Sequence, residues 1–285
     1  MARVLHCSDQ EYHADPCATP SLSYSTAAEL INVSPRSAYY YHPRLGGHRK
    51  KQTAPMKLGT LADALLFGGT DRIREIPLPN WRTKTAQEER DAFLADGLIP
   101  ALSHELQTAT DLVSRIFRVL HNDFGIHFTG TSQLALEWTE QSHEHGVVLC
   151  RGKLDHVVEV GGKLVIYDIK STADARPHKI QRRTVDMGYD IQAAAYMSAA
   201  EKWREDFAGR IDFIDLHCHI DGAVDVVPVQ ASGMLLDYGQ MRWTRAVDTW
   251  AECRASNRWP GMATSIIPGE VPAYAMQREM EIQGL

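Results

Sequence analysis

Cysteine is scarce in this sequence, and none of it follows the paired spacings of disulfide or zinc frameworks. The five cysteines stand at positions 7, 17, 150, 218 and 253, an odd number without a Cys-x-x-Cys pair. This pattern argues against a disulfide-stapled secreted fold and against a zinc ribbon. A reducing cytoplasm is the compartment that we expect.

Long apolar runs and nucleotide-binding loops are also missing. No stretch of 18 apolar residues occurs, so no transmembrane helix and no membrane contact are expected. Residues 1–13 lack the apolar core of a signal peptide. Neither a P-loop nor a G-x-G-x-x-G motif is present, which leaves nucleotide hydrolysis and nicotinamide chemistry unsupported. The net charge of −6 excludes a generic basic nucleic-acid coat protein.

What the sequence does contain is enough apolar material for a sizeable core. It has 285 residues, of which 44% are hydrophobic. This length allows one large domain or two small ones. Residues 1–20 show no periodicity and are expected to form a flexible N-terminal arm.

The most informative stretch is residues 150–172. Two runs rich in β-branched residues flank the pair Gly161-Gly162, whose glycines supply the positive φ of a two-residue hairpin turn. If the turn is this pair alone, counting outward places Asp155 opposite Asp168 on one face. Two like charges so placed repel each other. A chain keeps such a pair when a cation lies between the carboxylates or when one of them is protonated.

Lys170 follows Asp168 by two residues, so a strand places both side chains on one face. Two carboxylates and one ammonium group would converge there, and hard oxygen ligands suit Mg²⁺ or Mn²⁺. The lysine could orient or deprotonate a water, or stabilise developing negative charge. The natural substrate of such a set is a phosphodiester. The alternative is a surface hairpin with scattered charges, which a one-residue change of turn length would produce.

Two further acidic or amide positions could belong to the same site. Asp63 interrupts an apolar helix expected over residues 56–68, where a buried carboxylate must be paired or bound to metal. Alternatively, Asp63 lies on the solvent side of that helix. Gln133 and Glu137 lie four residues apart on a strand expected over residues 132–140, so they share a face. Both could equally be surface residues.

Other positions carry weaker signals. Gln192 and Tyr196 share one face of a helix expected over residues 189–203. Ser23, Ser25 and Ser34 are expected to be helix caps, with a phosphate-binding hydroxyl as the alternative. Basic clusters over residues 42–51 and 178–183 are either DNA contacts or solvated loops. His217 and His219, on a hairpin expected over residues 211–230 and turning near Asp221-Gly222, could hold zinc, although no third ligand is evident.

These residues together resemble the PD-(D/E)XK nuclease superfamily and, within it, the RecE-type exonucleases (exodeoxyribonuclease VIII) of phages and prophages. The resemblance covers roughly residues 22–277. It is carried by Leu58-Gly59-Thr60, Arg82-Thr83, residues 146–155, residues 167–174, Gly188-Tyr189 through Tyr196, and Trp259-Pro260-Gly261.

The resemblance implies a magnesium-dependent 5′→3′ exonuclease acting on double-stranded DNA ends, with Mn²⁺ as a possible substitute. Asp155 and Asp168 match the family's metal carboxylates, and the carbonyl of Ile169 would be a further ligand. Lys170 matches the catalytic lysine. The remaining residues expected to support the site or touch DNA are Gln192, Tyr196, Gln133, Glu137, Ser25 and Arg82.

The resemblance also implies partners and a setting. Such nucleases form homo-oligomeric rings around DNA and work with a single-strand annealing protein in phage-type recombination or repair. A bacterial host's cytoplasm, or a prophage origin, is therefore expected. Related nucleases with an iron–sulfur cluster need four closely spaced C-terminal cysteines, and only Cys218 and Cys253 stand late in this chain, so no cluster is expected.

Two positions depart from the family pattern. Asp63 stands where the family often has histidine, and Gln133 falls on its usual glutamate, although Glu137 could substitute.

We expect an α/β fold with a restriction-endonuclease-like core, in which helices flank a mixed central sheet. Residues 21–285 would form this single domain behind the arm of residues 1–20. The departures favour an alternative: a catalytically silent DNA-binding or assembly protein with a nuclease fold.

Overall fold

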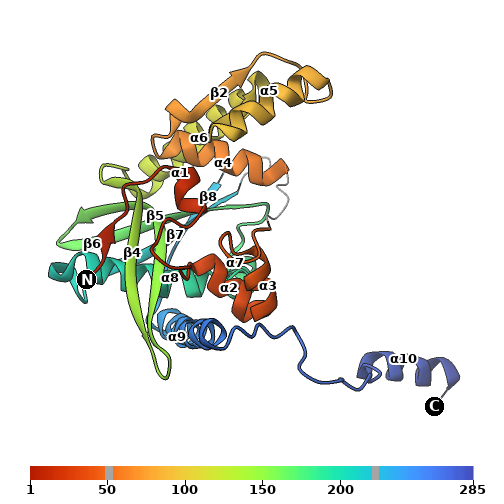
Figure 1. Ribbon diagram of the computed structural model, residues 1–285. Helices are drawn as coiled ribbons and strands as arrows, with labels where there is room; N and C mark the ends of the chain where they lie inside the picture. The colour runs from red at the N-terminus through yellow and green to blue at the C-terminus, as the bar shows by residue number, and fades with distance from the viewer. Residues whose placement is uncertain (49–53, 220–224, 285) are drawn as a thin grey trace.

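A mixed β-sheet forms the centre of the computed structural model, which describes residues 1–48, 54–219 and 225–284 (Figure 1). Among these residues the main sheet has six strands in the order β1-β4-β5-β6-β7-β8. β6 and β7 run parallel, and every other neighbouring pair is antiparallel, so the expected mixed sheet is confirmed. The strands are β1 Arg3–Val4, β4 Thr131–Ser142, β5 Gly146–Val160, β6 Lys163–Thr172, β7 Ile211–His219 and β8 Asp225–Gln230.

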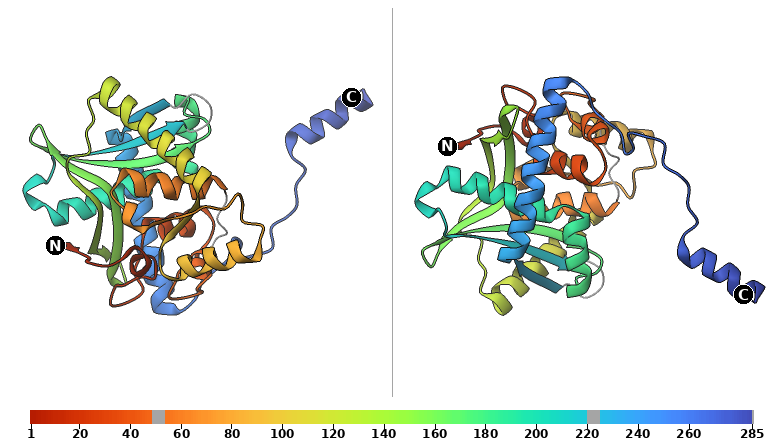
Figure 2. Two further views of the ribbon diagram at one scale, coloured as in Figure 1. Left: turned by 90° about the horizontal axis from the view of Figure 1, so that it is seen from above. Right: turned by 90° about the horizontal axis from the view of Figure 1, so that it is seen from below.

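Helices cover both faces of this sheet (Figure 2). One face packs on α2 Tyr24–Asn32, α8 Tyr189–Trp203 and α9 Gly233–Ser256, and the other on α4 Ala54–Leu66 and α6 Ser103–Phe124. Strand alternation on β6 divides its side chains between the two cores: Leu164 and Ile166 join the first, Val165 and Tyr167 the second. Asp168 and Lys170 continue the first series, so they point to the side of α8.

Several shorter elements complete the chain. A parallel pair, β2 Ile73–Ile76 and β3 Ile99–Leu102, lies with α5 Lys84–Ala95 beyond α4 and α6. Helix α7 Pro177–Asp186 lies between β6 and α8, and α10 Ala273–Gln283 stands away from the body (Figure 1). Within the described ranges, no helix has both the length and the apolar content to cross a bilayer. The remaining elements are α1 Asp9–His13, α3 Pro35–Tyr41 and the 3₁₀ turns η1 Thr70–Arg72 and η2 Glu205–Phe207.

The β5–β6 hairpin turns at Gly161 and Gly162, whose φ angles are +58° and +75°. Val160 pairs with Lys163, and the register continues inward to His156 opposite Tyr167. There the backbone pairing of the two strands ends, so Asp155 and Asp168 are not a ladder pair. The Asp155 carboxylate instead accepts a hydrogen bond from the Ile169 amide at 3.0 Å. The turn of the second expected hairpin, Asp221-Gly222, lies outside the described residues.

Residues 1–20, expected to form a flexible arm, lie against the sheet. Strand β1 pairs with β4, and α1 begins with a capping box between Ser8 and Glu11. The arm lacks periodicity because its elements are only two and five residues long, too short to show a repeat.

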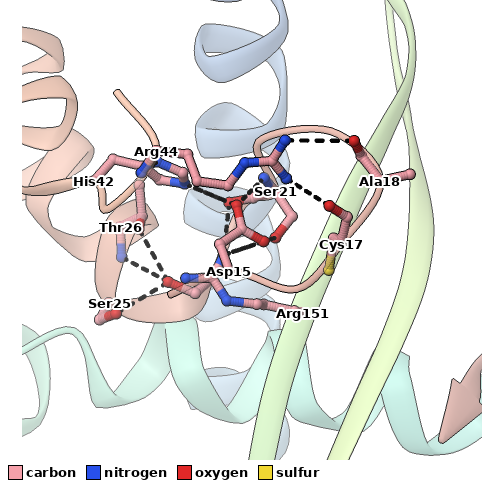
Figure 3. Close-up of polar contacts among 10 residues, drawn as sticks. Asp15, Cys17, Ala18, Ser21, Ser25, Thr26, His42, Arg44 and Arg151 are labelled. Carbon is pink, nitrogen blue, oxygen red and sulfur yellow. Dashed lines mark hydrogen bonds and ion pairs between the residues drawn. The ribbon is translucent and has the colours of Figure 1, made fainter. Parts of the chain in front are cut away.

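Asp15 anchors this arm in the buried polar network shown in Figure 3. Its carboxylate accepts hydrogen bonds from the Ser21 amide and hydroxyl at 2.9 and 2.7 Å, and lies 3.2 Å from the Arg151 guanidinium. His42 Nε2 is 3.5 Å away, and burial lowers the pKa of His42 to about 4. Arg151 is therefore the cation that balances Asp15, and the network fixes the arm to β5.

Helices α8 and α9 approach closely at Gly239. A Cβ atom at this position would lie 2.2 Å from the backbone oxygen of Asp190. Gly239→Ala should therefore lower the free energy of unfolding by about 1–3 kcal/mol, since such overpacking forces the two helices apart. Chemical denaturation followed by tryptophan fluorescence measures this change.

The matched control is Gly233→Ala on the same helix, where a Cβ atom would meet nothing within 4 Å. Its free energy of unfolding should stay within about 0.5 kcal/mol of the starting protein. Equal effects of the two substitutions would show that the α8–α9 contact tolerates a methyl group.

Candidate active site

Asp168, Lys170 and Gln192 form a buried triangle where β6 meets α8. Gln192 donates its side-chain Nε2–H to Asp168 Oδ2 at 2.6 Å. The Lys170 ammonium donates to Asp168 Oδ1 and to Gln192 Oε1. All three side chains are buried. The structure thus brings together three residues that the sequence analysis proposed from two separate segments.

Asp155 and Asp63 add two more carboxylates beside this triangle. Burial raises the pKa of Asp155 well above its ordinary value, and the charges of Asp168 and Asp63 raise it further. Burial also raises the pKa of Asp63 to about 6; Lys153 opposes this shift and Asp168 adds to it. Of the two places considered for Asp63, the structure shows the inward one. The three carboxylates repel one another, which a cation among them would relieve.

Lys170 is held as an ammonium ion. Burial acts to lower the pKa of Lys170, but the carboxylates of Asp168 and Asp215 outweigh it and bring the pKa above its ordinary value. The ring centroid of Tyr189 lies 4.4 Å from Nζ, a cation–π distance. This environment favours the role of proton donor and charge stabiliser over that of a base.

The donor set fits a hard divalent ion. The charges of Asp168 and Asp63 both act on Asp155, and Mg²⁺ binds through one or two carboxylates together with water and phosphate oxygens. No three His, Cys, Asp or Glu side chains in the described part of the chain are placed to hold an ion on their own. The carbonyl of Ile169, whose amide already touches Asp155, water and substrate would complete the coordination.

The zinc alternative at His217 and His219 finds no support. The same described residues offer no third side-chain ligand for such a site. His219 Nε2 lies 3.0 Å from the backbone oxygen of Ala173, and His217 is fully buried opposite Lys170.

A cavity of about 720 Å³ opens onto the triangle. Besides Lys170, its wall carries three cations, Arg151, Lys153 and Arg183. It also carries the aromatic rings of Tyr24 and Tyr196, which pack edge to face at 5.6 Å. A second cavity of about 460 Å³ is lined by Asp63 and shares Tyr24, Ile169 and Ser171 with the lining of the first cavity. Cations around a carboxylate cluster suit a polyanion that also binds metal.

Helix α7 supplies one rim of the larger cavity. Arg183 lines the cavity, while His178, Lys179 and Arg182 remain exposed on the same helix. The second basic cluster predicted from the sequence is therefore beside the site. In the first cluster, residues 49–51 lie outside the described residues.

Gln133 reaches the site, and Glu137 does not. Gln133 adopts a left-handed φ of +54°, and its Nε2 lies 3.4 Å from both carboxylate oxygens of Asp63. Glu137 is buried and pairs with Arg3 at 2.6 Å. Four strand residues span about 13 Å, so a shared face does not bring both side chains to one point. The expectation that Glu137 could take the place of Gln133 is corrected accordingly.

Ser25 and Arg82 have different surroundings from those expected. Ser23 and Ser34 cap α2 and α3, whereas Ser25 lies inside the first turn of α2, exposed on the cavity wall, with its Oγ 3.0 Å from that of Ser23. Arg82 is exposed just before α5 and lines neither of the two cavities. Of Ser25 and Arg82, Ser25 is therefore the one that lines the cavity.

Asp215 was not among the predicted site residues, and His217 was considered only as a zinc ligand, yet both lie beside Lys170. The parallel β6–β7 register places Asp215 opposite Asp168, and His217 opposite Lys170. Both ring nitrogens of His217 lack a hydrogen-bond partner among the described residues, and burial lowers the pKa of His217 to about 4. The available signal was polar residues alternating on one face of an otherwise apolar strand.

Comparisons with known proteins bear on the family and the fold of the chain. The model of the family described as the PD-(D/E)XK nuclease superfamily matches residues 21–229. The crystal structure of the "Putative exonuclease" from Eubacterium rectale is 14% identical, covers 98% of each chain and has a TM-score of 0.59, which shows a shared fold. The structure of SSO0001 is 10% identical over 82% of this chain and 80% of its own, with a TM-score of 0.37, too low to bear on the fold. No curated protein matches the chain.

Proposed function

The chain belongs to the PD-(D/E)XK nuclease superfamily, and we propose that it is a divalent-metal-dependent exonuclease that hydrolyses phosphodiester bonds at the ends of double-stranded DNA. The observation that carries the proposal is the Asp168–Lys170–Gln192 triangle. It lies beside two further carboxylates and opens onto a cavity lined by cations.

Each residue has a distinct role in the proposed reaction. A divalent ion held by Asp155, Asp168 and the Ile169 carbonyl, with Asp63 beside them, would acidify a water and neutralise charge on the phosphate. Lys170 donates hydrogen bonds to the attacking water or to the phosphate oxygens. Gln192 holds both Lys170 and Asp168 in place.

The cations and rings of the cavity wall suit the remainder of the substrate. Lys153 and Arg183 would pair with phosphates beside the reacting bond, whereas Arg151 lines the wall as the counter-charge of Asp15. Tyr24 and Tyr196 offer ring faces or edges to a base. Because the charges of Asp63, Asp155 and Asp168, the three carboxylates predicted to hold metal, act on one another, we favour an enzyme over a silent DNA-binding protein.

Finer properties are proposed from the RecE-type resemblance. These are magnesium as the working ion, 5′→3′ polarity, a ring-shaped homo-oligomer, and a single-strand annealing partner in phage-type recombination. The name of the Eubacterium rectale protein supports the exonuclease assignment.

The test compares end-labelled linear duplex DNA with covalently closed circular DNA in Mg²⁺, in Mn²⁺ and in EDTA. We expect the linear duplex to be digested, the closed circle to survive, and EDTA to stop the reaction. The rate at which a 5′ or a 3′ label is released gives the polarity. Digestion of the closed circle would indicate an endonuclease, and DNA binding without digestion would indicate a silent protein.

A further inference from the structure

Asp215 lies beside the Asp168–Lys170 pair, on the neighbouring strand β7. It is 5% exposed, and its Oδ1 lies 3.7 Å from Lys170 Nζ. This oxygen accepts no hydrogen bond from the residues that the structure describes. A buried carboxylate oxygen without a donor is costly, so the position calls for a function.

Lys170 already has closer partners than Asp215. Its ammonium group bonds to Asp168 Oδ1 and Gln192 Oε1. Gln192 Nε2 in turn occupies the other oxygen of Asp168. Both oxygens of the carboxylate that we assign to the metal are therefore engaged by donors of the protein.

An ammonium ion and a divalent cation compete for one carboxylate. When Asp168 turns to a metal ion, Lys170 loses its nearest anion and is repelled by the new charge. Asp215 Oδ1 is the buried acceptor next to it, and Nζ needs to move only about 1 Å to reach a charge-assisted hydrogen-bond length of about 2.8 Å.

We propose that Asp215 is a positioning residue that keeps Lys170 in the active site while Asp168 binds the divalent ion. This inference rests on the proposed metal-dependent function. Without Asp215, Lys170 stays bonded to Asp168 and opposes metal binding. Asp215 thereby allows one site to hold a lysine and a metal ion together.

The test is a double-substitution cycle read by Mn²⁺ binding, measured without DNA by calorimetry. Asp215→Asn should weaken Mn²⁺ binding about 10-fold. In a Lys170→Met background, where no ammonium competes, Asp215→Asn should change Mn²⁺ affinity by less than about twofold. A second readout is cleavage, in which Asp215→Asn should lower kcat while leaving KM for DNA unchanged.

The matched control is Asp212→Asn on the same strand, since Asp212 pairs with Lys163 at 2.8 Å outside the cavity; its Mn²⁺ affinity should not change. Thermal melting checks that each variant is folded, and Asp215→Ser supplies a second measurement if the Asn variant is not. Unchanged Mn²⁺ binding in folded Asp215 variants would overturn the proposal. An equal loss of Mn²⁺ affinity in the Lys170→Met background would also overturn it, because the loss would then come from the charge of Asp215 itself and not from its hold on Lys170. If the cycle behaves as expected but the protein cleaves no DNA, the proposed function fails and the role of Asp215 stands.

Discussion

Replacing Lys170 with methionine should lower the rate of DNA cleavage at least about 100-fold, the typical cost of removing one preorganised donor from a transition state. Methionine keeps most of the length of the side chain and removes its charge. DNA affinity should change only a few-fold, because Lys153 and Arg183 remain in the cavity wall. Single-turnover cleavage of end-labelled duplex in Mg²⁺ measures the rate.

The control for this substitution is Lys163→Met, at the other end of β6. The Lys163 side chain is half exposed and pairs with Asp212, so its loss should leave the rate unchanged. Asp168→Asn should match the loss seen with Lys170→Met. Metal-dependent cleavage within threefold of the starting rate in Lys170→Met would remove this lysine from the chemistry.

Replacing Asp15 with alanine should lower the free energy of unfolding by about 3–5 kcal/mol. The substitution leaves the buried Arg151 guanidinium without its counter-charge, and breaking a buried ion pair from one side has about this cost. It also removes the acceptor of both Ser21 hydrogen bonds (Figure 3). Urea unfolding followed by tryptophan fluorescence gives the value.

Asp237→Ala provides the comparison, since Asp237 is exposed on α9 and its loss should cost less than about 0.5 kcal/mol. A similarly small effect of Asp15→Ala would mean that residues 1–20 behave as the flexible arm that their sequence suggests. The measurement therefore decides between the two descriptions of this segment.

The parts of the site that sequence reasoning located are those set by local rules. A diglycine turn and strand alternation placed Asp155, Asp168 and Lys170 on one hairpin, and helical spacing placed Gln192 and Tyr196 on one face. Each of these relationships spans a few residues or a single turn. The same reasoning from the turn predicted too long a β5–β6 ladder. At the position of the expected Asp155–Asp168 pair, the Asp155 carboxylate accepts a hydrogen bond from the Ile169 amide.

The parts that sequence reasoning missed depend on how distant segments meet. Asp215 acts beside Asp168 only because β7 returns parallel to β6 in one register, and the chain between them gives no local sign of that register. The short β2–β3 pair and the N-terminal arm are held by tertiary contacts, so they carry no detectable period. Glu137 was misjudged because alternation gives the face of a side chain and not its distance along the strand.

The Gly161-Gly162 turn of the β5–β6 hairpin also limits which insertions the gene can tolerate. An extra residue between Gly161 and Gly162 that the strands took up would slip β6 by one position against β5 and turn its side chains to the opposite face. Asp168 and Lys170 would then point away from α8 without any substitution. Residues 77–98, which lead into and through α5, do not set the register of any site strand. Inherited differences in chain length should therefore accumulate there and not at the Gly161-Gly162 turn.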